Sequence, residues 1–163
     1  FRSALAHFEL GAGRAVVMDI GGGSLELALS ADGLLERLTS LPFGALRLSE
    51  EFLGAAPRHK DVEKLRKHIR PDLRKALPVR DWRGATVIGS GGTFTNLAGI
   101  YLARRGLPAR SPQGTRIPRA ELLHILEWLS ELTPSERATV PGLSPARADI
   151  IVAGLTVAAE VLS

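Results

Sequence analysis

The chain contains no cysteine, and it has only four histidines among its 163 residues. Without thiols there is neither a disulfide framework nor a thiolate metal site, and the histidines are too scattered to form a zinc-like cluster. Aromatic residues make up only 5% of the sequence. Any metal bound by this chain is therefore expected to be a hard cation held by oxygen ligands.

Long hydrophobic runs are also missing. No segment approaches the length of a membrane-spanning helix, and residues 1–7 lack the apolar core of a secretion signal. We therefore expect a cytoplasmic protein without membrane contact. With 163 residues, 45% of them hydrophobic, the chain is long enough for one domain with its own core.

The most informative segment is an apolar run that delivers Asp19 into three glycines and a serine, residues 21–24. Glycines can adopt positive φ and let backbone N–H groups approach an anion, while a carboxylate beside them can hold a cation. Apolar alternation resumes after the turn, so a second, antiparallel strand should bring Glu26 near Asp19. Taken alone, the segment fits a structural glycine hairpin equally well.

A second glycine-rich loop favours the functional interpretation. The β-branched run at residues 85–88 ends in Gly89 and leads through Ser90, Gly91 and Gly92 into a helical pattern. Free N–H groups and the positive dipole end of a helix favour phosphate, and the hydroxyl groups of Ser90, Thr93 and Thr95 can add donors. The alternative is close strand-to-helix packing through small residues. The predicted phosphate-binding residues are Gly21, Gly22, Gly23, Ser24, Gly89, Ser90, Gly91, Gly92 and Thr93, and the predicted metal ligands are Asp19 and Glu26.

These two motifs together resemble the exopolyphosphatase and guanosine pentaphosphate phosphatase (Ppx/GppA) family. Further segments stand in the family's order at Glu136-Arg137, at 141–143 and at 147–151, so the resemblance runs from Arg14 to the last helix. It implies an α/β fold of the ribonuclease H-like type, with a mixed sheet flanked by helices, within the actin-like ATPase and sugar-kinase superfamily. In that superfamily two such domains close over a phosphate-bearing ligand.

The resemblance also implies a reaction. The intact parent would hydrolyse the terminal phosphoanhydride bond of polyphosphate, or the γ-phosphate of guanosine pentaphosphate, with Mg²⁺ or another divalent cation held by Asp19 and Glu26. The family's first phosphate loop and its catalytic glutamate lie in the preceding domain, and nothing between Phe1 and Arg14 resembles them. We therefore expect residues 1–163 to be one domain, the C-terminal half of a two-domain module, without a catalytic residue. Such a fragment should be inactive without the N-terminal domain.

Two other functions stay open. Leu25 replaces a small polar threonine that is usual in the family, which leaves room for a sensor that binds guanosine polyphosphates without hydrolysing them. Half of a kinase or chaperone-like ATPase would share the superfamily. Chain-length preference, the choice between polyphosphate and pentaphosphate, and homodimer formation by the parent depend on residues outside this chain.

Charge is concentrated in one region. The net charge is +4 and the calculated pI is about 10.1, with most of the basic excess between Arg58 and Arg83. Such a field attracts polyanions, although the simpler interpretation is the solvated face of an amphipathic helix. Trp82 is the only aromatic residue in this stretch, which disfavours nucleic acid because stacking platforms are missing.

The pattern predicts an antiparallel meander that a parallel strand extends through a helical crossover. Strands are expected at Arg14–Ile20, Ser24–Ala31, Leu34–Leu41 and Ala85–Gly89, with an Asp32-Gly33 turn. Helices are expected at Gly44–Leu53, at Asp61–Leu77 with a kink or split at Pro71, at Gly92–Leu102, after Pro118, in a capping box at Thr133–Glu136, and from Ser144-Pro145 to the end.

Overall fold

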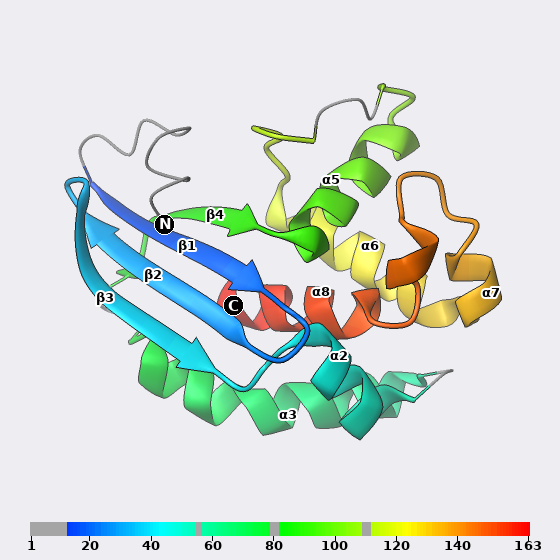
Figure 1. The fold of residues 1–163 in the computed structure, drawn as a ribbon, viewed down its shortest axis with the longest axis horizontal. Helices are drawn as coiled ribbons and strands as arrows, with labels where there is room; N and C mark the ends of the chain where they lie inside the picture. The colour runs from blue at the N-terminus through cyan, green and yellow to red at the C-terminus, as the bar shows by residue number, and fades with distance from the viewer. Residues whose placement is uncertain (1–12, 55–56, 79–81, 109–111) are drawn as a thin grey trace.

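A mixed sheet of four strands forms one layer of the computed structural model, which describes residues 13–54, 57–78, 82–108 and 112–163 (Figure 1). The strands are β1 (Arg14–Ile20), β2 (Leu25–Ala31), β3 (Leu34–Leu41) and β4 (Thr86–Ser90). Their order in the sheet is β3-β2-β1-β4, with β1, β2 and β3 antiparallel and β4 parallel to β1. This is the predicted ribonuclease H-like pattern, and each predicted strand boundary lies within one residue of the observed one.

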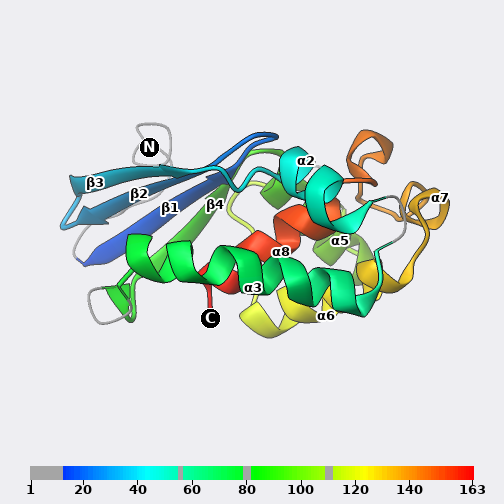
Figure 2. The ribbon, with the colours of Figure 1, turned by 90° about the horizontal axis from the view of Figure 1, so that it is seen from below.

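Helices cover one face of this sheet (Figure 2). They are α2 (Ala45–Leu48), the π-helical turn η1 (Ser49–Leu53), α3 (His59–Ala76), α5 (Gly92–Arg104), α6 (Arg119–Glu131), α7 (Pro134–Arg137), the 3₁₀ turn η2 (Pro145–Arg147) and α8 (Ile151–Val161). Every residue of α8 from Ile151 to Ala159 is buried, because α8 lies between the sheet, α3 and α6. In the described part of the chain, no helix is long and apolar enough to cross a membrane.

Strict alternation divides the two faces of the β1–β2 hairpin. Met18 and Ile20 of β1 and Leu25 and Leu27 of β2 point into the core. Their neighbours along each strand, Asp19 and Glu26 among them, must therefore face the other way. The hairpin between β2 and β3 turns at Asp32 and Gly33, both with positive φ, and the Asp32 carboxylate accepts a 2.8 Å hydrogen bond from the Gly13 N–H.

Two helical predictions need correction. Helix α3 runs unbroken from His59 to Ala76 with the exposed Pro71 inside it, so the predicted split is wrong. The ring faces solvent, which spares the buried side of the helix from the steric and hydrogen-bonding cost of proline. The last helix begins at Ile151 rather than at Pro145, and the Ser49 hydroxyl binds the carbonyl of Asp149 at 2.7 Å just before it. Asp149 thus lies just before α8.

Helix α2 fixes the loop that follows β1. The N–H group of Ala45 donates to the Gly21 carbonyl at 2.8 Å, and those of Leu46 and Arg47 donate to the Gly22 carbonyl at 3.1 Å each. Gly44 allows this approach, since a Cβ atom there would overlap the backbone of Gly22 and Gly23. The first turn of α2 therefore binds the loop itself.

Gly44→Ala should destabilise the protein by about 3 kcal/mol, because backbone atoms must move to make room for the methyl group. Gly23→Ala is the control: a Cβ atom at Gly23 would meet nothing within 4 Å, and its φ is not positive. Urea unfolding followed by circular dichroism measures both. Equal midpoints for the two variants would contradict the role assigned to Gly44.

Candidate phosphate-binding site

The two predicted glycine loops lie side by side. Strands β1 and β4 are parallel neighbours, so both end at the same edge of the sheet, and β4 leads directly into α5 (Figure 1). The loops after β1 and β4 therefore both lie at the carboxyl ends of neighbouring parallel strands, which is where open α/β sheets bind ligands. Asp19 occupies the junction, opposite Glu26 of β2 and Ser90 of β4.

The loop after β4 leads into α5, whose first backbone N–H groups are not used by the fold. Gly91 caps the helix with φ of +83°, and its carbonyl accepts from Thr95 N–H at 3.1 Å. Within the described ranges the N–H groups of Gly92, Thr93 and Phe94 donate to no acceptor. Because these groups stand at the positive end of the helix dipole, they are suited to bind an anion.

The hydroxyl groups predicted as further donors are used by the fold. The Thr93 side chain is only 2% exposed, and its hydroxyl donates to the Ile20 carbonyl at 3.3 Å. The Thr95 hydroxyl and the Asn96 amide both donate to the Gly92 carbonyl, at 3.2 and 2.7 Å. Thr93 thus joins the end of β1 to the start of α5, and it can serve the site only through its backbone N–H.

The loop after β1 also has backbone N–H groups that are available as hydrogen-bond donors. The carbonyls of Gly21 and Gly22 accept hydrogen bonds from α2, and the N–H groups of Gly22, Gly23 and Ser24 have no acceptor in the described part of the chain. None of the three glycines has positive φ, so the expectation that the loop uses this freedom is wrong. A Cβ atom at Gly21, Gly22 or Gly23 would meet nothing closer than 3.5 Å, so the close packing of α2 against this loop depends on Gly44.

Two carboxylates stand between the loops. Asp19 and Glu26 are paired across the hairpin and share the face away from the core. The Asp19 carboxylate lies against Gly91, where a Cβ atom would overlap it, while Glu26 accepts hydrogen bonds from the hydroxyl groups of Ser24 and Ser40.

This pair of carboxylates suits one kind of metal. The residues that the structure describes contain no group of three or more potential metal ligands. A pair of carboxylates fits Mg²⁺, which completes its octahedron with water and phosphate oxygens rather than with a full protein cage.

Arg147 is the site residue that sequence reasoning left unassigned. Its guanidinium lies over Gly92, with Nη2 2.6 Å and Nε 3.2 Å from the position of the missing Cβ. Among the described residues it forms no ion pair or hydrogen bond. A cation at the positive end of a helix dipole is unfavourable by itself, and a bound anion would offset this. Its place in the ordered motif 147–151 was the signal that marked it.

Gly89 and Arg137 have other roles. The space that a Cβ atom at Gly89 would fill holds the ring of Phe94, so this glycine serves packing between β4 and α5. Arg137 is buried, and burial lowers the pKa of its guanidinium while the charge of Asp149 acts in the opposite direction. The Glu136-Arg137 and 147–151 segments are therefore linked electrostatically in the fold.

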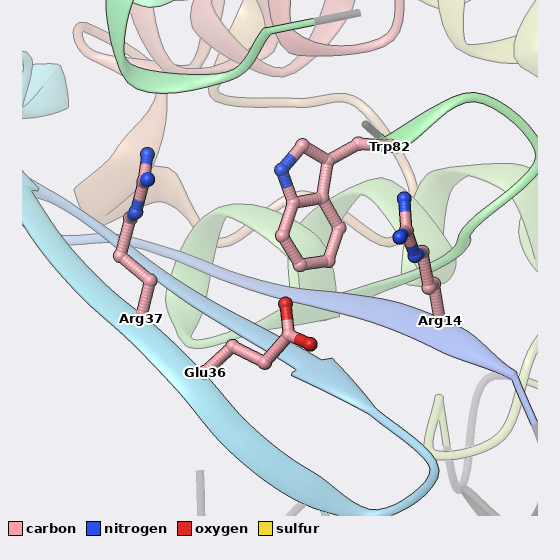
Figure 3. A pocket seen from close by; sticks show the side chains of 4 residues that line it. All are labelled: Arg14, Glu36, Arg37 and Trp82. Carbon is pink, nitrogen blue, oxygen red and sulfur yellow. The ribbon is translucent and has the colours of Figure 1, made fainter. Parts of the chain in front are cut away.

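The pocket in Figure 3 lies elsewhere. Its lining residues are Arg14, Glu36, Arg37 and Trp82, at the end of the sheet opposite the glycine loops. The Arg14 guanidinium stands 5.7 Å from the centre of the Trp82 ring, and Arg37 donates to the last carbonyl of α3, of Ala76, at 3.5 Å. None of the predicted site residues lines this pocket.

Arg147→Gln should weaken binding of tripolyphosphate to this chain about tenfold, the effect of losing one charged hydrogen-bonding partner. Isothermal titration calorimetry measures the dissociation constant. Arg119→Gln removes an exposed charge at the start of α6 and serves as the control. Equal affinities of the two variants would rule out a phosphate contact by Arg147.

Comparison with known proteins identifies the family of this chain. The family model described as the Ppx/GppA phosphatase family matches residues 1–163. An exopolyphosphatase 1 of Mycobacterium leprae is 36% identical over 97% of this chain and 47% of its own length. An exopolyphosphatase 2 of Mycobacterium tuberculosis is 33% identical over 98% of this chain and 50% of its own.

A solved structure gives the same result for the fold. The crystal structure of an Aquifex aeolicus member of the Ppx/GppA family superposes with a TM-score of 0.84 at 23% identity, over 98% of this chain and 51% of that one. The chain thus spans about half the length of the relatives it matches.

Proposed function

The chain belongs to the Ppx/GppA phosphatase family, and we propose that it supplies one wall of the cleft of a phosphoanhydride hydrolase. The substrate is the end of an inorganic polyphosphate chain, guanosine pentaphosphate, or both. The names of the curated relatives, exopolyphosphatases 1 and 2, support polyphosphate. Guanosine pentaphosphate rests on the motif resemblance alone.

The observation that carries the proposal is the convergence of unpaired donors at one edge of the sheet. The N–H groups of residues 22–24 and of residues 92–94 have no acceptor in the described part of the chain, and Arg147 stands beside the second set. Donors fixed in advance around a phosphoryl group bind its non-bridging oxygens and stabilise the charge that grows on them during transfer. Two loops can hold more of these oxygens than either loop alone.

Asp19 and Glu26 are the residues that would hold Mg²⁺. A bound Mg²⁺ would neutralise phosphate charge as a Lewis acid. Asp19 has the more constrained position, because β1 is paired on both sides and Gly91 packs against its carboxylate. Glu26 is exposed and is oriented by the hydroxyl groups of Ser24 and Ser40.

The group that activates the attacking water should come from the half of the relatives' sequence that this chain does not cover. Among the described residues near the loops, the two carboxylates are assigned to metal and Arg147 to phosphate, so no general base remains. In this proposal the complementary half also supplies the opposite wall of the cleft.

The chain by itself should therefore release no orthophosphate from polyphosphate above the rate without protein, with or without Mg²⁺. A molybdate assay measures the release, and the same chain joined to the complementary half serves as the positive control. Turnover by the chain alone would overturn the division of roles between the two halves.

The sensor hypothesis loses its local support. The side chain of Leu25 is fully buried in the core, on the face opposite Glu26. A threonine at this position would not point toward the loops, so its replacement by leucine carries no information about chemistry at the site. Likewise, no specific observation among the described residues favours phosphoryl transfer to an acceptor, as in half of a kinase.

Asp19→Asn in the protein that joins this chain to its complementary half should lower Mg²⁺-dependent polyphosphate hydrolysis by at least about a hundredfold, because one charged metal ligand is lost. Asp32→Asn makes the same change at the opposite end of the β1–β2–β3 meander, at positive φ that asparagine tolerates, and should keep full activity. Thermal melting checks that both variants fold. Full activity of the Asp19 variant would disprove the metal assignment.

A further inference from the structure

The side chain of Asn96 joins α5 to the segment that carries Arg147. Asn96 lies in the second turn of α5 and is only 9% exposed. Its Nδ2 group donates to the Gly92 carbonyl at 2.7 Å, and its Oδ1 atom accepts from the Ser144 N–H group at 2.6 Å. A carbonyl can only accept and a backbone N–H group can only donate, so these two partners fix the orientation of the amide.

The segment between α7 and α8, residues 138–150, has few other attachments to α5. In the described part of the chain, no backbone–backbone hydrogen bond joins it to that helix. One close contact lies nearby: a Cβ atom at Gly142, where φ is +86°, would overlap the backbone of Gly99. Among the described residues, the bond between Ser144 and Asn96 is therefore the only hydrogen bond between this segment and α5.

This hydrogen bond lies close to Arg147 at both of its ends. Ser144 begins the 3₁₀ turn η2, and the Arg147 N–H group donates to the Ser144 carbonyl at 2.8 Å. At the other end of the amide, Gly92 is the residue over which the Arg147 guanidinium lies. Asn96 thus binds both the residue that starts the turn of Arg147 and the residue against which its guanidinium packs.

The guanidinium of Arg147 depends on the position of its own backbone. In the described part of the chain it forms no ion pair or hydrogen bond. A long side chain without such partners loses rotamer freedom when a ligand binds, and a fixed backbone limits that cost. A shift of the turn by about 1 Å would also misplace the guanidinium relative to an anion held by the N–H groups of residues 92–94.

We propose that Asn96 is a positioning residue for phosphate binding. It holds the turn of residues 144–147 against α5, so that Arg147 faces the anion beside the free N–H groups of that helix. The inference rests on the proposed function, because the anion is the phosphoryl group assigned to the glycine loops. The effect passes through Arg147, since the Oδ1 and Nδ2 atoms of Asn96 are each bonded to a backbone group.

Packing of α5 alone does not require asparagine at this position. Asparagine has a lower helix propensity than alanine or leucine, and a buried amide needs partners. The buried neighbours Leu97, Ala98 and Ile100 are apolar, as is usual for a helix face in a core. The amide adds a direction that an apolar side chain cannot supply, with a donor toward α5 and an acceptor toward the segment of Arg147.

The test is a double-mutant cycle in this chain. Binding of tripolyphosphate is measured by isothermal titration calorimetry for Asn96→Ala, Arg147→Gln, the double variant and the unmodified chain. Thr156→Val is the control, because it removes a buried hydroxyl group whose hydrogen bond stays within α8. Circular dichroism and urea unfolding check that each variant is folded at the temperature of the titration.

A second variant removes the same hydrogen bond from its other side. Ser144→Pro deletes the N–H donor and leaves Asn96 in place, at a φ of −67° that proline adopts. It should reproduce the loss of affinity seen in Asn96→Ala. This variant keeps the test decisive even where alanine at position 96 prevents folding.

Asn96→Ala should weaken tripolyphosphate binding about fivefold in the unmodified chain and less than about twofold where Arg147 is already glutamine, because both changes act on one contact. The control should bind as the unmodified chain does. A purely structural role predicts the same loss in both backgrounds. Equal losses in both backgrounds, or unchanged affinity in Asn96→Ala or Ser144→Pro, would each overturn the proposal.

Failure of this inference and failure of the proposed function give different results. Weaker binding by Arg147→Gln with unchanged binding by Asn96→Ala would refute only the role of Asn96. If the unmodified chain does not bind tripolyphosphate at all, the proposed phosphate site itself is wrong, and the inference falls with it.

Discussion

The parallel pairing of β1 with β4 is the constraint on which the site depends. It places Asp19 opposite Ser90 and brings two loops that are 65 or more residues apart in sequence to one edge of the sheet. The Thr93 hydroxyl extends the link beyond the ladder, because it bonds the last carbonyl of β1 from the first turn of α5. The backbone N–H groups of each loop suit an anion, and the strand pairing brings the two loops into one surface.

Close packing against the buried core holds the two loops of this surface in place. Helix α8 is buried along nearly its whole length, and a Cβ atom at its Gly154 would come within 2.9 Å of the Thr93 side chain. On the other side, α2 donates hydrogen bonds to the carbonyls of the first loop and packs against it at Gly44. The donors are thus held by packing rather than by flexible side chains, which is the arrangement that electrostatic stabilisation of a phosphoryl group requires.

Charge in this chain is divided between two surfaces with different geometry. At the glycine loops, backbone N–H groups, one arginine and two carboxylates are fixed at short range, as expected where one phosphoryl group and a metal meet. Along α3 the cations Lys60, Lys64, Lys67, Arg74 and Lys75 are exposed, with the exposed carboxylate of Asp72 on the same helix.

Local patterns in the sequence determined the strands, the Asp32-Gly33 turn, the Thr133–Glu136 capping box and the register that faces Glu26 toward Asp19. These features depend on alternation and on contacts a few residues apart, which a sequence displays directly. Tertiary structure decided that the Thr93 hydroxyl serves the fold, that Leu25 lies in the core, and that Arg147 reaches Gly92 across 55 positions. Such placements depend on which distant segments pack together, and no local periodicity encodes that.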